Sequence, residues 1–499
     1  MAAGGNLGKL LRPGLAPESG ALIDLLPPRR AWTYGELDVA ADEFADALTR
    51  AGIEPETRVA ILAENCAEHL IAYMGTMRAG AITVPVNHRL AADTVRFILE
   101  DCAASLCIVD SGRVPLLPPN LRRILIRGEG ADGFSAFLAR GTAPFTARQP
   151  PSGTAEILYT SGSTGRPKGV VLSHAGQLWA LRVHVAAEPA KGERSMIVAP
   201  LYHMNALFNL SVCLMNGIEV VLMPRFEAAT YLMAVAEYRC THLSGIPTMF
   251  AMMARQAELL ARLDLTSVRA VSIGSAPLTE ALIGRVQKMF PNAAVSNGYG
   301  TTEAGPSIFG DHPQGLPCPP VSIGYPIAEV EVRLVNGSAE EGVLQVRAPA
   351  MFTEYLNLPK ITAEKLHDGW YDTGDIMRRD AAGFYYFTGR ADDMFVCGGE
   401  NVFPGEIEKM LERHPAVMQA AVVPVPDEIK GQIPIAFVVL RDRSVPLEEL
   451  KRFSLASGPA FSHPRAFVVV DELPVASTHK PDKRPLMARA LEVARALKR

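Results

Sequence analysis

Residues 159–169 read YTSGSTGRPKG and follow an apolar stretch, 156–160, that is typical of a buried strand. The loop could present backbone N–H groups, hydroxyl side chains and the ammonium group of Lys168 to a polyphosphate. It is not a Walker A loop, because that motif has four residues between its glycines, whereas two residues separate Gly162 from Gly165 here. Taken alone, a loop of this composition is more often a flexible surface turn, so its interpretation depends on the rest of the chain.

Strands and helices alternate on both sides of this loop. Thr33 and Glu36 form a capping box that predicts the start of a helix, and an apolar strand at 59–62 follows it. The alternation continues well past the loop, which predicts an α/β architecture with buried, largely parallel sheets. Short alternating strands at 321–387 predict a small β-rich subdomain, and a final α+β segment begins near Asp393.

The composition excludes several classes of protein. A chain of 499 residues exceeds what one hydrophobic core usually serves, so we expect at least two domains. The net charge of -4, from 49 Lys+Arg and 53 Asp+Glu, argues against a nucleic-acid or anionic membrane surface. Seven scattered cysteines without a CxxC pair argue against a disulfide framework or a zinc site and favour a reducing cytoplasm.

Two segments of the sequence could be taken for a signal peptide or a membrane span, and we interpret neither of them in that way. The N-terminal residues lack the continuous apolar core of a signal peptide. The stretch 206–223 is interrupted by Asn209, Asn216 and Glu219, so it predicts a buried helix, a turn and a strand.

Residues 297–303, NGYGTTE, carry side chains that suit a nucleotide and its metal ion. Tyr299 could stack on a base, Thr302 could bind a phosphate, and Glu303 could hold the magnesium ion that neutralises the phosphate. This combination strengthens the interpretation of the hydroxyl-rich loop at 159–169 as a phosphate-binding loop.

Three further segments follow in order: 369–375, GWYDTGD; 388–393, TGRADD; and 397–401, CGGEN. Together with the two earlier segments they resemble the adenylate-forming superfamily of acyl- and aryl-CoA synthetases, luciferases and peptide-synthetase adenylation domains. The resemblance covers roughly residues 30–490. Each motif alone is a weak signal, whereas their shared order makes a chance match an unattractive explanation.

The resemblance implies a fold. The α/β N-terminal domain, at 1–389, would contain two packed α/β subdomains and a small β-barrel-like one. A short hinge at 390–393 would follow, with Asp392 on it, and a small mobile α+β domain at 394–499 would complete the chain.

The resemblance also implies residues that bind ATP and CoA. The loop would hold the phosphates, Asp375 and Arg390 would grip the ribose, and Glu303 would hold Mg2+. Gly398 and Gly399 would let the pantetheine arm of CoA pass close to the backbone, with Phe461 and Arg465 as further CoA contacts. The implied ATP- and AMP-binding residues are Thr160, Ser161, Gly162, Ser163, Thr164, Gly165, Lys168, Gly274, Ser275, Ala276, Pro277, Asn297, Gly298, Tyr299, Gly300, Thr301, Thr302, Asp375 and Arg390.

The carboxylic acid would lie beside His203, where the family places an aromatic or histidine gate. A lone histidine in an apolar segment is more often a satisfied core group, and the flanking residues favour the gate. Asn205 could bond a polar group on the acid or cap a helix. The implied acyl pocket contains His203, Met204, Asn205, Gly298, Gly300 and Gly305.

Residues 474–486, PVASTHKPDKRPL, resemble the lysine-bearing tail of the family, although His479 stands where a glycine usually precedes the lysine. Lys480 is the aligned candidate and Lys483 is the competitor. The implied catalytic residues are Lys480, His203, Thr302, Glu303 and Lys168.

The implied reaction uses ATP, Mg2+ and CoA to convert a carboxylic acid into an acyl-adenylate and then into an acyl-CoA thioester. A stand-alone adenylation enzyme that loads a carrier protein is the alternative, and a nucleotide-binding module without turnover is a more distant one. The identity of the acid stays open between a short, branched or hydroxylated acid and a small aryl acid. A homodimer also stays open, and neither nucleic acid nor an integral membrane segment is expected.

Overall fold

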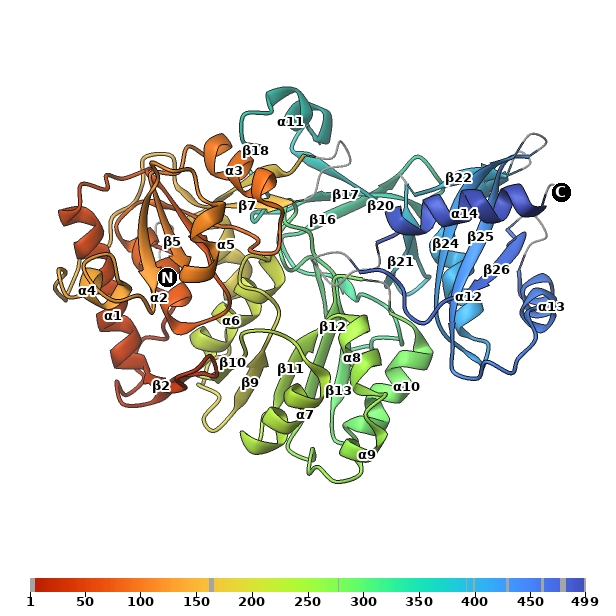
Figure 1. Cartoon of the computed structure of the whole chain (residues 1–499), viewed down its shortest axis with the longest axis horizontal. Helices are drawn as coiled ribbons and strands as arrows, with labels where there is room; N and C mark the ends of the chain where they lie inside the picture. Colours follow the sequence, from red (N-terminus) through yellow and green to blue (C-terminus); the bar gives the residue numbers. More distant parts are fainter. Residues whose placement is uncertain are drawn as a thin grey trace.

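The computed structural model describes residues 5–160, 166–276, 278–391, 393–397, 400–427, 430–458, 462–475 and 482–497. Figure 1 shows two large sheets flanked by helices, a smaller antiparallel sheet beside them and an α+β unit at the C-terminal end. These layers confirm the predicted α/β fold class with its β-rich and C-terminal α+β parts. Within the described ranges, no helix has both the length and the apolar character needed to cross a membrane.

The first large sheet has seven strands, which are parallel apart from the antiparallel pair of β1 with β2. In sheet order the strands are β13 (Ala294–Gly298), β12 (Ala270–Gly274), β11 (His242–Gly245), β9 (Arg194–Ile197), β10 (Glu219–Leu222), β1 (Gly20–Asp24) and β2 (Arg30–Thr33).

The second large sheet also has seven strands, and its antiparallel edge is made by β7, β8 and β18. The other neighbours are parallel. In sheet order the strands are β18 (Glu354–Tyr355), β8 (Lys168–Ser173), β7 (Thr154–Thr160), β4 (Ile82–Pro85), β3 (Arg58–Leu62), β5 (Leu106–Asp110) and β6 (Arg122–Ile126).

Helices cover both faces of the two large sheets, and one hydrophobic cluster joins side chains of both sheets to α1, α2, α5 and α6. The α1 helix begins as predicted, because Thr33 and Glu36 satisfy each other's backbone N–H groups in a capping box. These helices are α1 (Tyr34–Arg50), α2 (Ala67–Arg78), α3 (Ala92–Asp101), α4 (Phe134–Leu138), α5 (His174–Arg182), α6 (Met204–Asn216), α7 (Ala228–Glu237), α8 (Pro247–Met253), α9 (Ala257–Leu260) and α10 (Glu280–Met289), with a 3-10 turn at Ser111–Leu116.

The smaller sheet is antiparallel and lies next to both large sheets. A short helix, α11 (Pro359–Lys365), and a two-stranded pair, β14 (Phe309–Gly310) with β15 (Tyr325–Pro326), accompany it. Its strands are β16 (Glu331–Val335), β17 (Glu341–Arg347), β19 (Leu366–His367), β20 (Trp370–Arg379) and β21 (Tyr385–Arg390).

The C-terminal α+β unit has its own hydrophobic cluster, whose members all lie at residue 395 or later. Its strands are β22 (Phe395–Cys397), β23 (Glu400–Val402), β24 (Val417–Asp427), β25 (Gly431–Leu440) and β26 (Ala466–Val469). Its helices are α12 (Pro404–Glu412), α13 (Leu447–Ser457) and α14 (Arg484–Leu497).

Several strands of the large sheets have no counterpart among the sequence predictions, and β1 and β8 are two of them. The β1 strand pairs with the nearby β2 and with β10, nearly two hundred residues later in the chain, and the second pairing is not visible in any local pattern. The β8 strand begins at Lys168, which we had placed on the loop, and its first residue pairs with Thr160 of β7. The loop is therefore the connection of a hairpin, and its two described ends are adjacent.

A carboxyl group is buried inside the larger cluster at Glu156 of β7. Its Oε2 accepts a hydrogen bond of 3.1 Å from the Tyr73 hydroxyl, and burial raises the pKa of Glu156 to about 7. A cavity of about 10 Å³, with space for about one water molecule, lies against Glu156, Gln177 and Ser211. Ionisation of Glu156 in the folded protein therefore costs free energy, and the carboxyl group loses its proton only when the pH exceeds about 7.

We predict that Glu156→Gln raises the melting temperature more at pH 8 than at pH 5. Because the pKa of Glu156 in the folded state lies above its ordinary value of 4.5, the folded protein holds a proton between these pH values that the unfolded chain has lost, and stability falls as the pH rises through that window. The gain at pH 8 is at most about 3 kcal/mol. Calorimetry at both pH values measures it, with the exposed Glu364→Gln as the control. An equal effect of Glu156→Gln at both pH values would contradict the prediction.

Candidate active site

The predicted site residues converge where the three sheets of the larger part meet. Gly274 and Gly298 end two neighbouring strands of the first sheet and pair with each other. Lys168 begins β8 of the second sheet. Asp375 and Arg390 pair across β20 and β21 of the antiparallel sheet.

The first polar cluster at this meeting point contains Tyr299, Asp375 and Arg390. The Tyr299 hydroxyl donates a hydrogen bond to Asp375 Oδ2, and Arg390 Nη1 lies 3.0 Å from Asp375 Oδ1. Asp375 is only 5% exposed. Burial, reinforced by the Asp375 charge, raises the pKa of Tyr299 well above its ordinary range. The phenol therefore stays protonated and acts as the hydrogen-bond donor.

The second polar cluster contains Glu303, Tyr355 and Lys168. The Tyr355 hydroxyl donates a hydrogen bond of 2.9 Å to Glu303 Oε1, and the Lys168 ammonium lies 4.5 Å from the centre of the Tyr355 ring. Partial burial lowers the pKa of Lys168, and the nearby Glu303 charge opposes this shift. Glu303 is 9% exposed. The Glu303 carboxylate thus contacts the hydroxyl of Tyr355 and the Lys168 ammonium group contacts its ring. A carboxylate and a cation held in this way suit a metal-bound phosphate.

A divalent cation would need ligands beyond the protein at this position. The described residues contain no group of three His, Cys, Asp or Glu side chains that could hold a metal ion. Mg2+ usually keeps water ligands and binds through one or two carboxylates together with substrate phosphates. A single carboxylate at Glu303 therefore fits Mg2+ that arrives with ATP, and does not fit a resident metal ion.

Polar contacts also tie the start of α6 to the loop after β12. Asn205 Nδ2 donates to Ser275 Oγ at 3.0 Å, and Asn209 Nδ2 donates to the Asn205 carbonyl at 2.8 Å. Ser275 has a φ of 64°, in the left-handed region that non-glycine residues rarely adopt. His203 immediately precedes α6, and its ring lies edge-on to Tyr202 at 4.5 Å.

The chain matches two family models across this arrangement. Residues 14–356 match the model described as AMP-binding enzyme, and residues 406–480 match the model described as AMP-binding enzyme C-terminal domain. The chain belongs to the AMP-binding enzyme family.

Known members of the AMP-binding enzyme family resemble the chain along nearly its whole length. A feruloyl-CoA synthase of an Amycolatopsis species is 31% identical, over 90% of this chain and 92% of that protein. A fatty acid–[acyl-carrier-protein] ligase of Streptomyces coeruleorubidus, ScoC, is 32% identical, over 89% of both chains. The crystal structure of the anthranilate CoA ligase AuaEII in complex with anthranoyl-AMP superposes with a TM-score of 0.90, at 26% identity, over 99% of both chains.

Several residues predicted for this AMP-binding enzyme are not placed. Ser161, Gly162, Ser163, Thr164, Gly165, Pro277, Asp392, Gly398, Gly399, Phe461 and Lys480 lie outside the described residues. The described residues around Lys480 are nevertheless informative: the Asp482 N–H donates to the Pro474 carbonyl at 2.7 Å, so the two ends of this stretch are held together. The competitor Lys483 forms an ion pair of 2.8 Å with Glu408 of α12.

The other predicted residues have identifiable surroundings. Asn297 donates to the Val321 carbonyl at 2.8 Å, and Thr301 accepts from the Ala304 N–H at 2.9 Å, so both support the loop that carries Glu303. Met204 is buried and Thr302 is half-buried. Ala276 is also half-buried, as are Arg465 and the last residue of β7, Thr160.

The sequence did not reveal Tyr355 or the pair of His184 with Ser307. Tyr355 holds Glu303, and His184 Nε2 lies 2.7 Å from Ser307 Oγ next to the predicted acyl pocket. The His184 ring also packs edge-on against Phe208 of α6 at 5.4 Å. The Tyr355–Glu303 and His184–Ser307 hydrogen bonds join residues more than fifty positions apart, and none of Tyr355, His184 and Ser307 stands in a recognisable motif.

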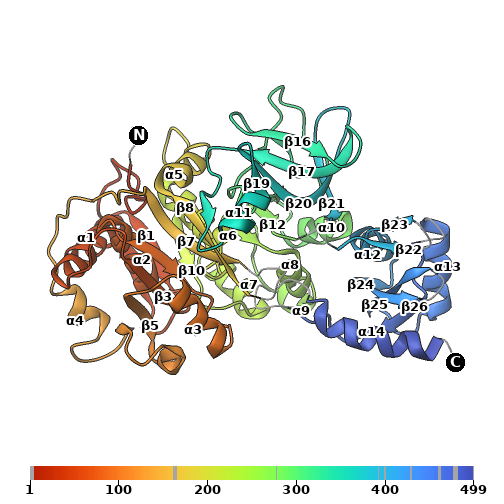
Figure 2. The same cartoon turned by 90° about the horizontal axis from the view of Figure 1, so that it is seen from above.

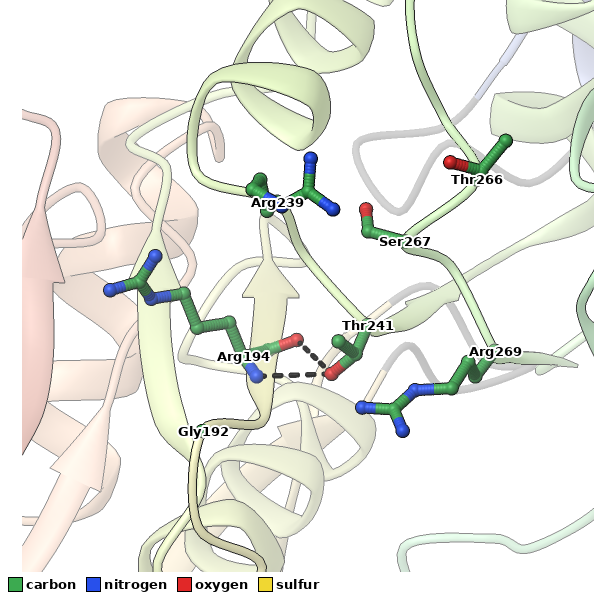
Figure 3. A pocket seen from close by; sticks show the side chains of 7 residues that line it. All are labelled: Gly192, Arg194, Arg239, Thr241, Thr266, Ser267 and Arg269. Carbon is green, nitrogen blue, oxygen red and sulfur yellow. Dashed lines mark hydrogen bonds between the residues drawn. The ribbon is translucent and has the colours of Figure 1, made fainter.

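A separate cavity of about 410 Å³ is lined by the seven residues drawn in Figure 3. Its lining comes from the amino ends of β9, β11 and β12 and from the loops next to them, whereas Gly274 marks the carboxyl end of β12. Its three arginines, Arg194, Arg239 and Arg269, are each paired with a carboxylate. Because none of the predicted site residues lines this cavity, we do not assign it to the reaction.

The glycines of the predicted pocket differ in what the fold requires of them. A Cβ atom at Gly300 would lie 2.5 Å from the Pro306 carbonyl oxygen, and one at Gly305 would lie 2.8 Å from Ala350 Cβ. A Cβ atom at Gly298 would meet only Ser272 Oγ at 3.8 Å and the Ile273 carbonyl at 4.0 Å. The fold therefore demands glycine at Gly300 and Gly305, whereas at Gly298 the space is open.

We predict that Gly298→Ala leaves the melting temperature nearly unchanged and weakens substrate binding. The added methyl group would not collide with protein atoms, and it would take up space that a substrate needs. Gly300→Ala is the matched control, and it should lower the melting temperature because of the close backbone contact. Thermal unfolding and the KM values for ATP and acid measure both effects. Unchanged KM values in Gly298→Ala would remove Gly298 from the site.

Proposed function

We propose that the chain is an AMP-forming acid–CoA ligase, which converts a carboxylic acid and ATP into an acyl-adenylate and pyrophosphate, and then the acyl-adenylate and CoA into an acyl-CoA thioester and AMP. One observation carries this proposal: a cation, a carboxylate and an acid–guanidinium pair from three sheets converge at one point in a member of the AMP-binding enzyme family. The roles of individual residues are part of the proposal.

In the first half-reaction, a carboxylate oxygen of the acid attacks the α-phosphorus of ATP, and the bond from that phosphorus to pyrophosphate breaks. Lys168 stabilises the negative charge on the phosphates, and Thr302 hydrogen-bonds to them. Glu303 would hold Mg2+, which supplies charge neutralisation when bound. Tyr355 fixes the Glu303 carboxylate, so the charge is in place before ATP arrives.

The nucleoside part of ATP would lie against the first cluster. Asp375 accepts hydrogen bonds from the ribose hydroxyls, and Arg390 holds that carboxylate in an ion pair of 3.0 Å. The strand end at Gly298 leaves open space for the adenine ring next to Tyr299.

The acid would lie between the start of α6 and the segment at 299–307. His203 closes this space next to the carboxylate, and Met204 contributes an apolar wall. The amide groups of Asn205 and Asn209 and the His184–Ser307 pair offer polar contacts near the wall. These groups offer hydrogen-bond partners to a hydroxyl or other polar group on the acid, which an unsubstituted fatty acid lacks.

The thiol that accepts the acyl group is that of CoA or that of a carrier protein. ScoC is named for a carrier protein, whereas the feruloyl-CoA synthase and AuaEII are named for CoA. Arg465 supports CoA, because its Nη2 atom is buried and has no hydrogen-bond partner among the described residues. A phosphate of CoA would supply that partner. Gly398 and Gly399 would guide the pantetheine arm, next to Phe461.

The domain boundaries and the setting of the protein are further parts of the proposal. Separate hydrophobic clusters before and after residue 395 support an N-terminal domain at 1–389, a hinge at 390–393 that contains Asp392, and a mobile domain at 394–499. The cysteines of the described residues are free, which supports a reducing cytoplasm.

We predict that Lys480→Ala slows adenylation by about 10²–10³-fold, because it removes one charge contact to the transition state. The same variant should form thioester from synthetic acyl-adenylate and CoA at nearly the normal rate. A panel of fatty, aryl and hydroxylated acids, read by pyrophosphate release, first identifies a usable acid. Acid-dependent ATP–pyrophosphate exchange then measures adenylation, and thioester yield with CoA or with a phosphopantetheine-bearing carrier protein identifies the thiol.

Lys483→Ala is the matched control for this prediction. Because Lys483 is held by Glu408, its loss should lower the melting temperature and leave the two half-reaction rates in their normal ratio. A selective loss of adenylation in Lys483→Ala, with normal adenylation in Lys480→Ala, would show that the alignment across His479 is wrong.

A further inference from the structure

The contact between the C-terminal unit and the rest of the chain is polar. Every described member of the hydrophobic cluster of this unit lies at residue 395 or later, so no apolar cluster of the described residues crosses into the unit. The contact instead uses one side of α12, which packs on β21 and lies next to α10 in Figure 2. The opposite side of α12, with Ile407 and Leu411, faces the cluster of its own unit.

Lys409 makes a short contact across this surface. Its Nζ atom donates a hydrogen bond of 2.6 Å to the Phe387 carbonyl, and the ammonium group lies 5.7 Å from the centre of the Phe387 ring. Phe387 lies on β21, next to a register shift between β20 and β21. A shift of this kind interrupts the ladder of backbone hydrogen bonds, and Lys409 supplies a donor at that place.

The surroundings of Lys409 make the bond costly to leave unmade. Burial lowers the pKa of Lys409, while Glu406, Glu408 and Glu412 of its own helix favour the charged form and Arg378 of β20 opposes it. A buried ammonium group that lost its carbonyl partner would need another hydrogen-bond acceptor or water.

Two weaker contacts accompany Lys409 along the same surface. Arg285 of α10 faces Glu412, one helical turn beyond Lys409, and the two charges attract each other. Arg255 Nε lies 3.3 Å from Met418 Sδ at the start of β24. In each of the three contacts a lysine or arginine side chain reaches across the surface, and such contacts can separate without exposing an apolar core.

We propose that Lys409 is a positioning residue that holds the C-terminal unit in the described orientation through its bond to the Phe387 carbonyl, and that this bond breaks when the unit turns between the two half-reactions. The inference rests on the proposed function for the existence of two half-reactions. The orientation itself is a property of the contact and can be measured without turnover.

The test is Lys409→Met, which keeps most of the side-chain volume over the Phe387 ring and removes the donor. The half-reaction that uses the described orientation should slow by about tenfold, while the other keeps or gains rate, since loss of one charge-assisted hydrogen bond changes a population by about that factor. Lys451→Met is the matched control, because Lys451 is an exposed lysine of α13 that pairs only loosely with Glu448, at 3.9 Å.

A cross-link measures the orientation independently of activity. Cysteines introduced at Arg255 and Met418, whose side chains touch, would be joined by a short bismaleimide in a Cys318→Ser background, since Cys318 is exposed and the other cysteines are buried. Lys409→Met should lower the cross-linking rate about tenfold relative to Lys451→Met.

The possible outcomes separate this inference from the proposed function. A lower cross-linking rate with opposite changes in the two half-reactions supports both. A lower cross-linking rate with no half-reaction detectable in the parent protein supports the positioning role of Lys409 and overturns the proposed function. An unchanged cross-linking rate, or an equal loss of both half-reactions with a lowered melting temperature, overturns the role of Lys409.

Discussion

Two hydrogen bonds from tyrosine to carboxylate hold the three sheets of the larger part together where they meet. Tyr299, just after the last strand of the first sheet, donates to Asp375 of the antiparallel sheet, and Tyr355, on the edge of the second sheet, donates to Glu303. Burial raises the pKa of both phenols, so each stays protonated and donates. The same bonds fix the two carboxylates that the proposed reaction needs, and stability and function therefore depend on the same atoms.

This arrangement explains why the site needs so few charged groups. Asp375 forms an ion pair with Arg390, Glu303 interacts with the charge of the nearby Lys168, and each carboxylate accepts a hydrogen bond from a neutral hydroxyl that adds no charge. A site built in this way leaves net positive charge to be supplied by the metal ion that accompanies ATP. The three sheets that carry these groups also share one hydrophobic cluster, which favours a fixed spacing between them.

The sequence predicted those parts of the site that depend on local patterns. The segment at 297–303 and the acid at Asp375 are recognisable because glycines, hydroxyls and carboxylates stand close together in order. Tyr355 and the His184–Ser307 pair could not be predicted, because their roles arise from contacts between distant segments. The pairing of β1 with the distant β10 could not be predicted for the same reason, whereas the capping box at Thr33 located the start of α1 to the residue.

The central claim is that the acid is activated by transfer of AMP, and isotope transfer tests it most directly. With an acid whose carboxylate carries 18O, one labelled oxygen should leave with AMP when the thiol displaces it, and pyrophosphate should carry no label, because only the α-phosphorus of ATP bonds to the carboxylate. Mass spectrometry of the nucleotide and phosphate products measures this. Label in inorganic phosphate together with ADP, or unlabelled AMP after a full turnover, would contradict the account.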